Sequence, residues 1–394
     1  MHYDNRAVCK PNRAARGDLL DSGSNQLIID VGALDAPVRR ALGRDNAKIT
    51  DWDLQTLHHS GNPTTDSVYR VTGSAVCADH TLPWTVVLKV IHAADGHTEP
   101  GSLGYWRREP FVYESGVLDL LPAGLAAPAC LRLDAPEAGM VWLWLEAIDI
   151  AGDTLWPLAR YGLAARHLGR FNGTYAADAA RPSFPWLGRD YLCGWAALGA
   201  DGIARLPAAL DHPLVGRVYP GPIATQLRHL WEGRDDLLRL LAALPQTFCH
   251  MDALRRNLIA RRDGQGRDQT VLIDWGEAGI GALGEDLAAF VTGSVFLDPT
   301  TPPARAVDAV AWAGYIEGLH DVGWHGNVDL VRQGYATAAA LRILGGTTWV
   351  LHVAMDEAHH PEVAQAFEQP IYELLDRWAE AIQVVVEGLD QSRH

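Results

Sequence analysis

The chain has 394 residues, of which 48% are hydrophobic and 21% are charged, a composition typical of a folded globular protein with room for two sub-domains. Its formal net charge of −15 disfavours nucleic acid and anionic membrane surfaces as partners and would attract a cationic small molecule. The five cysteines have no metal-binding spacing and the N-terminal stretch has no apolar signal core, so we expect a cytoplasmic protein without a membrane-spanning segment.

The first part of the chain predicts an extension followed by a small sheet. Residues 1–45 are polar and turn-rich, which indicates an N-terminal extension that folds over the body. Short β-rich runs separated by turn residues then predict a β-rich lobe, the N-lobe, over residues 46–146. Its expected strands are 49–58, 67–76, 85–91, 130–133 and 140–145, and its one expected helix is 103–121.

The second part, residues 147–394, predicts a mostly helical lobe, the C-lobe. Ala/Leu-rich segments such as 156–175 and 223–243 repeat apolar residues at three- and four-residue spacing. Strand-like pieces return only around 247–251 and 270–273. The fold class is therefore α+β, with a small antiparallel sheet and one helix in the first lobe and helices in the second.

Two polar segments of the C-lobe carry the strongest functional signal. His250, Asp252 and Asn257 have the H-x-D-x-x-x-x-N spacing of a phosphoryl-transfer catalytic loop, and Asp274 opens an Asp-x-Gly after an apolar run. We expect Asp252 to be the catalytic base that aligns an acceptor hydroxyl, with His250 as a brace for the loop. Asn257 and Asp274 are expected to bind Mg²⁺ through hard oxygen atoms.

Lys89 provides an independent signal in the N-lobe. It is one of three lysines in the chain and interrupts the apolar strand 86–91, where a desolvated cation needs a carboxylate or a phosphate as partner. We expect Lys89 to bind the α- and β-phosphates of a nucleotide. A carboxylate on the following helix should orient it, and Glu109 in the first helical turn is preferred, with Glu114 as the second candidate.

A turn at residues 60–67 is the candidate cover for the nucleotide phosphates. It contains a single glycine, and Thr64 and Ser67 could approach the phosphates through hydroxyl and backbone N–H groups. An ordinary hairpin turn is the alternative interpretation.

At this point the chain resembles the aminoglycoside phosphotransferase family of the protein-kinase-like fold. The resemblance spans about residues 50–290 and depends on the segments 87–89, 145–146, 168–173, 250–257, 273–276 and 284–288. It implies that Glu146 to Ile148 form the linker whose backbone meets adenine, and that Asp286 braces the catalytic loop. Two positions depart from the family pattern: Met251 stands where glycine is usual, and Trp275 where a smaller residue is common.

The resemblance implies an ATP- and Mg²⁺-dependent kinase that phosphorylates a hydroxyl of a small molecule, such as a cationic antibiotic or an aminosugar. Similar catalytic loops serve choline, homoserine and sugar-amine kinases, so a metabolite kinase is the alternative. Leu254 replaces the lysine of protein kinases and disfavours a protein substrate. A non-catalytic nucleotide-binding protein is a further alternative, disfavoured because lysine, base and metal ligands are all present. Acidic candidates for the acceptor side are Glu277, Asp321, Asp356 and Glu357.

Overall fold

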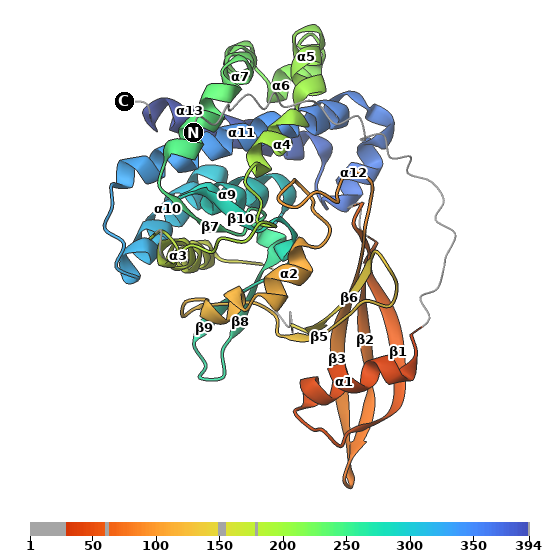
Figure 1. Ribbon diagram of the computed structural model, residues 1–394. Helices are drawn as coiled ribbons and strands as arrows, with labels where there is room; N and C mark the ends of the chain where they lie inside the picture. Colours follow the sequence, from red (N-terminus) through yellow and green to blue (C-terminus); the bar gives the residue numbers. More distant parts are fainter. Residues whose placement is uncertain (1–28, 60–62, 149–154, 178–179, 393–394) are drawn as a thin grey trace.

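The computed structural model describes residues 29–59, 63–148, 155–177 and 180–392. Figure 1 shows two lobes, a curved sheet at lower right and a larger helical body above and to the left. Residues 1–28 of the expected extension and residues 60–62 of the expected phosphate-covering turn lie outside the described residues.

A five-stranded antiparallel sheet forms the N-lobe, in the order β1-β2-β3-β6-β5. The strands are β1 (Lys48–His59), β2 (Thr65–Cys77), β3 (His80–His92), β5 (Cys130–Asp134) and β6 (Met140–Glu146). All five expected strands are confirmed. Their β-branched and aromatic residues alternate between two faces, and the outer face carries Tyr69, Val71, Trp84, Val86 and Leu88 in one buried cluster.

Helix α1 (Val31–Leu42) covers this outer face (Figure 1). Asp30 caps its first turn by accepting the N–H of Gly32 at 2.8 Å, and Leu34 and Val38 are fully buried against the sheet. Residues 31–42 of the expected extension are therefore part of the N-lobe core. Helix α1 was not predicted, so the lobe has a second helix besides the one expected from the sequence.

Helix α2 (Arg108–Glu114) lies between the sheet and the helical body (Figure 1). It is shorter than the expected helix 103–121, because Gly116 has φ +73° and separates it from the 3-10 turn η1 (Val117–Leu120). Pro110 stands in the first turn of α2, where its missing N–H costs no helical hydrogen bond.

The C-lobe is mostly helical, as expected. Its helices are α3 (Leu158–Thr174), α4 (Tyr191–Ala197), α5 (Ala200–Ala209), α6 (Pro213–Val218), α7 (Gly221–Glu232), α8 (Arg234–Ala243), α9 (Glu285–Leu297), α10 (Ala304–Asp321), α11 (Val328–Met355), α12 (His360–Ala366) and α13 (Ile371–Ser392). The expected helix 223–243 is divided into α7 and α8 at Gly233.

Helix α11 is the centre of this lobe and packs against α4, α5, α9 and α13. It is long and apolar enough to cross a membrane, although no membrane-spanning segment was expected from the sequence, but 72% of its most apolar window is buried inside the protein. Its composition is thereby explained as that of a core helix.

Short strands support the two polar segments singled out in the sequence. β7 (Gln246–Cys249) pairs with β10 (Gly279–Ala282), while β9 (Asp268–Leu272) lies between β4 (Leu125–Ala126) and β8 (Leu258–Arg262). The sequence predicted β7 and β9 but not β4, β8 or β10. Residues 250–257 thus connect β7 to β8, and residues 274–278 connect β9 to β10, so both segments emerge beside one another.

Candidate active site

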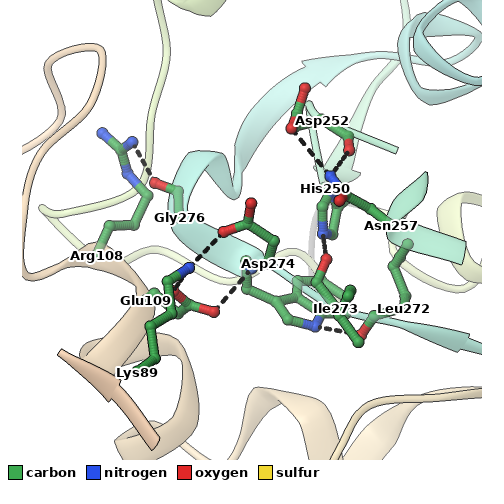
Figure 2. A network of polar contacts seen from close by, with 11 residues as sticks. Lys89, Arg108, Glu109, His250, Asp252, Asn257, Leu272, Ile273, Asp274 and Gly276 are labelled. Atoms are coloured by element: carbon green, nitrogen blue, oxygen red, sulfur yellow. Dashed lines mark hydrogen bonds and ion pairs between the residues drawn. The ribbon is translucent and has the colours of Figure 1, made fainter. Parts of the chain in front are cut away.

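Lys89 joins the two lobes at the centre of the site. Its ammonium nitrogen lies 2.6 Å from Glu109 Oε2 and 2.6 Å from Asp274 Oδ1 (Figure 2). Glu109 also accepts the N–H of Trp275 at 3.3 Å, whereas Glu114 is exposed on α2. One cation from β3, one carboxylate from α2 and one carboxylate from the C-lobe therefore meet.

The electrostatics of this cluster follow from burial and proximity. Burial opposes the charge of Lys89, but the carboxylates of Asp274 and Glu109 outweigh it and raise the pKa of Lys89. The neighbouring Lys89 cation lowers the pKa of Asp274, and burial raises the pKa of Glu109. Two carboxylates share one ammonium group, so the cluster has an excess of negative charge where a metal ion would bind.

The catalytic-loop residues face the same region (Figure 2). Asn257 Nδ2 donates to the Asp252 carbonyl at 2.8 Å and to Asp252 Oδ2 at 3.0 Å, which fixes the orientation of the Asp252 carboxylate. His250 Nε2 lies 3.0 Å from the carbonyl of Ile273, and Ile273 donates its N–H to the carbonyl of Asn257 at 3.0 Å. These bonds hold the segments 250–257 and 273–274 together.

His250 is fully buried and touches the ring of Trp275, with 4.7 Å between ring centroids. Burial lowers the pKa of His250, which suits a neutral brace better than a proton carrier. Trp275 itself is fully buried between Phe171 and Phe248, and its indole donates to the carbonyl of Leu272 at 2.9 Å. The large ring thus fills an aromatic cluster next to the segment 274–277.

Asp286, at the start of α9, supports the catalytic loop from below. Its carboxylate accepts the backbone N–H groups of His250 at 3.0 Å and Met251 at 2.8 Å, and the side-chain amide of Asn172 at 2.9 Å. Tyr315 completes the network by donating to Asn172 Oδ1 at 2.8 Å. Asp286 therefore contacts the loop that the resemblance expected it to brace, and its role in catalysis remains a prediction.

Met251 has φ +68°, in the left-handed region, although it is not glycine. Its N–H is held by Asp286, and its carbonyl accepts a hydrogen bond from the buried Arg342 of α11. Both sides of this residue are therefore fixed by hydrogen bonds, which compensates for the steric cost of a left-handed methionine.

The oxygen donors fit a divalent cation. The amide nitrogen of Asn257 is committed to Asp252, which directs its oxygen elsewhere, and the Asp274 side chain is 46% exposed. One amide oxygen and one carboxylate are the hard ligands that Mg²⁺ takes while it keeps water and phosphate oxygens as the others. Asn257 and Asp274 would hold the ion beside the phosphates.

The residues expected around the nucleotide lie at the edge of the same region. Glu146 accepts Arg261 of β8 at 2.9 Å and the N–H of Ala129 at 3.1 Å, so its side chain connects the end of β6 to the C-lobe. Ile148 follows as a half-buried residue. Their roles at adenine remain predictions for the backbone of this linker.

Strand register corrects the expectation for Ser67. Ser67 pairs with Val90, and Lys89 pairs with Val68, so the side chains of Ser67 and Lys89 point to opposite faces of the sheet. The Ser67 hydroxyl therefore does not face the phosphate region. Thr64 is buried just before β2, and its carbonyl accepts the N–H of His92 at 2.9 Å, so a phosphate contact through its hydroxyl remains a prediction.

Among the four acidic candidates for the acceptor side, Glu277 alone lies in the segment 274–277, next to the Lys89–Asp274 pair. It accepts Arg108 at 2.9 Å, and burial raises the pKa of Glu277 to about 7. Asp321, the last residue of α10, is held by Arg166 of α3 at 2.7 Å, and Asp356 by His359 at 2.8 Å. Glu357, in the turn before α12, has no contact that ties it to the site in the described part of the chain.

Three residues of the site were missed in the sequence: Arg108, Asn172 and Arg342. Arg342 had a usable signal, because it is the one charged residue in the apolar run 336–344, as Lys89 is in its strand. Asn172 belongs to a segment that carried the resemblance but had no role there. Arg108 gave no signal, since an arginine at the start of a short helix is usually exposed.

The two-lobed fold, the Lys89–Glu109 pair and the braced loop around Asp252 define a small-molecule phosphotransferase with a protein-kinase-like fold. The chain belongs to the phosphotransferase enzyme family, whose model matches residues 66–325. A search of curated proteins finds no significant match.

Several solved structures are similar to this chain at low sequence identity. An aminoglycoside phosphotransferase from Alicyclobacillus acidocaldarius is 16% identical, with a TM-score of 0.50, 87% of this chain covered and 92% of the other. A microcompartment-associated aminopropanol kinase is 17% identical, with a TM-score of 0.47 and coverage of 92% and 98%. A spectinomycin phosphotransferase, solved with ADP and spectinomycin, is 10% identical, with a TM-score of 0.45 and coverage of 83% and 93%.

Proposed function

We propose that this protein transfers the γ-phosphoryl group of ATP, bound with Mg²⁺, to a hydroxyl of a cationic small molecule such as an aminoglycoside, an aminosugar or an amino alcohol. The observation that carries the proposal is the meeting of Lys89, Glu109 and Asp274 at 2.6 Å contacts beside the oriented Asp252 carboxylate. Phosphoryl transfer depends chiefly on positioning and charge neutralisation, and these are what such an arrangement supplies.

Each residue has a step in this proposal. Lys89, oriented by Glu109, binds the nucleotide phosphates, and Asn257 and Asp274 hold the ion that neutralises their charge. Asp252 accepts the proton of the acceptor hydroxyl while it aligns that oxygen with the phosphoryl group. Asp286 and Asn172 keep the loop in place, and the backbone of Glu146 to Ile148 receives adenine.

The formal charge of −15 supports a cationic acceptor, because an acidic protein raises the local concentration of cations. Kinases of metabolites such as choline, homoserine or sugar amines fit the same description in part. ATP consumption measured with a panel of acceptors distinguishes an antibiotic kinase from a metabolite kinase.

Nucleotide binding is the first test. We expect ATP with Mg²⁺ to raise the melting temperature of the wild-type protein, and to raise it less when EDTA removes the ion. An unchanged melting temperature at millimolar ATP and Mg²⁺ would remove the basis of the proposal.

Acceptor-dependent turnover is the second test. ATP consumption is measured with a panel of aminoglycosides, amino alcohols and sugar amines, and hits are confirmed by mass spectrometry of the phosphorylated product. Asp252→Asn keeps the shape of the side chain but removes the base, so we expect at least a hundredfold loss of kcat with nucleotide binding retained. The exposed Asp268→Asn is the matched control. Full activity of Asp252→Asn would show that the base is misassigned, and inactivity toward every acceptor with intact nucleotide binding would favour a non-catalytic nucleotide-binding protein.

A further inference from the structure

Arg108 is completely buried at the start of α2, directly before Glu109. Its guanidinium donates to the carbonyl of Gly276 at 2.9 Å, to Glu277 Oε2 at 2.9 Å and to the carbonyl of Trp186 at 3.0 Å, and a further bond reaches the carbonyl of Ser102. Figure 2 shows the side chain directed toward Gly276. A single arginine thus binds three separate segments of the chain.

Two consecutive residues of α2 grip the same short segment. Glu109 accepts the N–H of Trp275, and Arg108 donates to Gly276 and Glu277. Residues 275, 276 and 277, which follow Asp274, are therefore all hydrogen-bonded to the first turn of α2. Because Glu109 also holds Lys89, a shift of α2 relative to this segment would move Lys89 relative to Asp274.

We propose that Arg108 is a positioning residue for phosphoryl transfer, which locks α2 to the metal-binding segment 274–277 and thereby keeps Lys89 and Asp274 in register. The inference rests on the proposed function. Arg108 connects the part of the site that contains Lys89 and Glu109 to the part that contains Asp274. It acts through Glu109 and the 274–277 segment and touches neither nucleotide nor acceptor.

The geometry requires arginine. Its planar fork presents five donors in fixed directions, which allows one side chain to serve a carboxylate and three carbonyls, while lysine has a single nitrogen with three donors. Arg108→Lys therefore retains the positive charge beside Glu277, but its three donors on one nitrogen cannot serve that carboxylate and all three carbonyls at once. The Arg108→Lys variant therefore tests the loss of these hydrogen bonds without a loss of charge.

The neighbouring Arg107 supplies a matched control. It belongs to the same turn, but its guanidinium lies over the rings of Phe111 and Trp106, at 4.7 and 5.4 Å from their centroids. Arg107→Lys is expected to keep the activity of the wild type within twofold.

The first experiment needs no acceptor and no turnover. Amide hydrogen exchange is followed in the full-length chain for peptides that cover 108–114 and 274–278. In Arg108→Lys we expect exchange in both segments to accelerate by a common factor of at least ten, with little change in Arg107→Lys. Exchange that rises in 108–114 and stays at the wild-type rate in 274–278 would overturn the proposal.

Kinetics then distinguish positioning from a merely structural role. Per folded molecule, Arg108→Lys should lose at least tenfold in kcat, with the KM for Mg²⁺-ATP within threefold of the wild type, because the alignment of the reacting groups is lost more than ground-state binding. A lowered melting temperature with an unchanged kcat per folded molecule would contradict the proposal.

Glu277→Gln keeps the size of the side chain and protects the test if Arg108→Lys folds poorly. Glu277→Gln should reduce kcat by a smaller factor than Arg108→Lys does. In the double variant, the fold-loss in kcat should be less than the product of the two single fold-losses, since both changes weaken the bond between Arg108 and Glu277. Multiplicative losses would count against a shared lock. If wild-type protein shows no turnover at all, the proposed function fails, whereas the exchange experiment still decides the lock.

Discussion

Asp286 and Met251 are connected by a hydrogen bond of 2.8 Å from the Met251 N–H to Asp286 Oδ1. Met251 has φ +68°, so this bond stabilises a left-handed residue immediately before the candidate base Asp252. The carbonyl of Met251 is bound in turn by Arg342. The orientation of the catalytic loop thus depends on two charged groups from helices α9 and α11.

At position 251 glycine should give a more stable protein than alanine, which is the reverse of their usual order in stability. Met251→Gly and Met251→Ala both lose a buried side chain, at a cost of about 2–4 kcal/mol in the free energy of unfolding. We expect Met251→Gly to be the more stable of the two by about 1 kcal/mol, because alanine retains the left-handed strain. Urea unfolding measures both. The buried Ala339→Gly in α11 is the control and should be destabilising by a similar amount; equal stability of the two variants at 251 would argue against strain there.

Asp286→Asn should weaken the support of the catalytic loop. The carboxylate accepts three hydrogen bonds, whereas an amide has one acceptor oxygen and turns its NH₂ group toward a donor. We expect a loss of about 1–3 kcal/mol in the free energy of unfolding, measured in urea, together with a lower kcat. Asp308→Asn, which alters the contact with Tyr335 in α11, is the control for kcat. An unchanged kcat of Asp286→Asn at saturating substrate would show that the hydrogen bonds of Asp286 to the loop do not affect catalysis.

Lys89→Met should reduce the stabilisation of the protein by nucleotide. It removes the cation that we propose binds the phosphates, and it leaves Glu109 and Asp274 without their shared partner. We expect binding of Mg²⁺-ATP to weaken at least tenfold, equivalent to about 1.4 kcal/mol less stabilisation at a given high ligand concentration. The measurement compares melting temperatures with and without ligand. Lys48→Met, an exposed substitution on β1, should respond to ligand as the wild type does.

His167 should make stability depend on pH in the acid range. It is buried beside Thr270, with 2.9 Å between Nδ1 and the hydroxyl oxygen, and burial lowers the pKa of His167 from 6.5 to about 3. Between these two values the unfolded chain binds the proton and the folded chain does not, so stability falls as the pH falls from 6.5 toward 3, by up to about 1.4 kcal/mol per pH unit.

Urea unfolding between pH 7 and pH 4.5 tests this dependence. The slope of unfolding free energy against pH should become shallower in His167→Gln and stay unchanged in the exposed His80→Gln. Some slope should remain in His167→Gln, because burial lowers the pKa of His250 as well. Identical slopes for all three proteins would show that His167 is not held neutral.

Local patterns were sufficient for much of this fold. Strands of the N-lobe alternate between two faces and the C-lobe helices repeat at three and four residues, so both lobes could be predicted. The short strands β4, β8 and β10 could not, because β4 has two residues, β8 ends in two arginines and β10 alternates with glycine, so their sequences carry no strand pattern of their own. The division of residues 221–243 at Gly233 was likewise missed, since both halves continue the same apolar spacing.

Residue types and spacing alone predicted a phosphoryl-transfer loop and a metal-binding Asp-x-Gly, and they singled out an isolated lysine in an apolar strand. Each of these reflects a local need for charge in an apolar setting, which a linear pattern reveals. The tertiary structure alone decided that Glu109 meets Lys89, that the Ser67 side chain faces away from the site, and that Arg108 and Arg342 are buried. These depend on burial and on contacts between residues up to 185 positions apart, which no local pattern encodes.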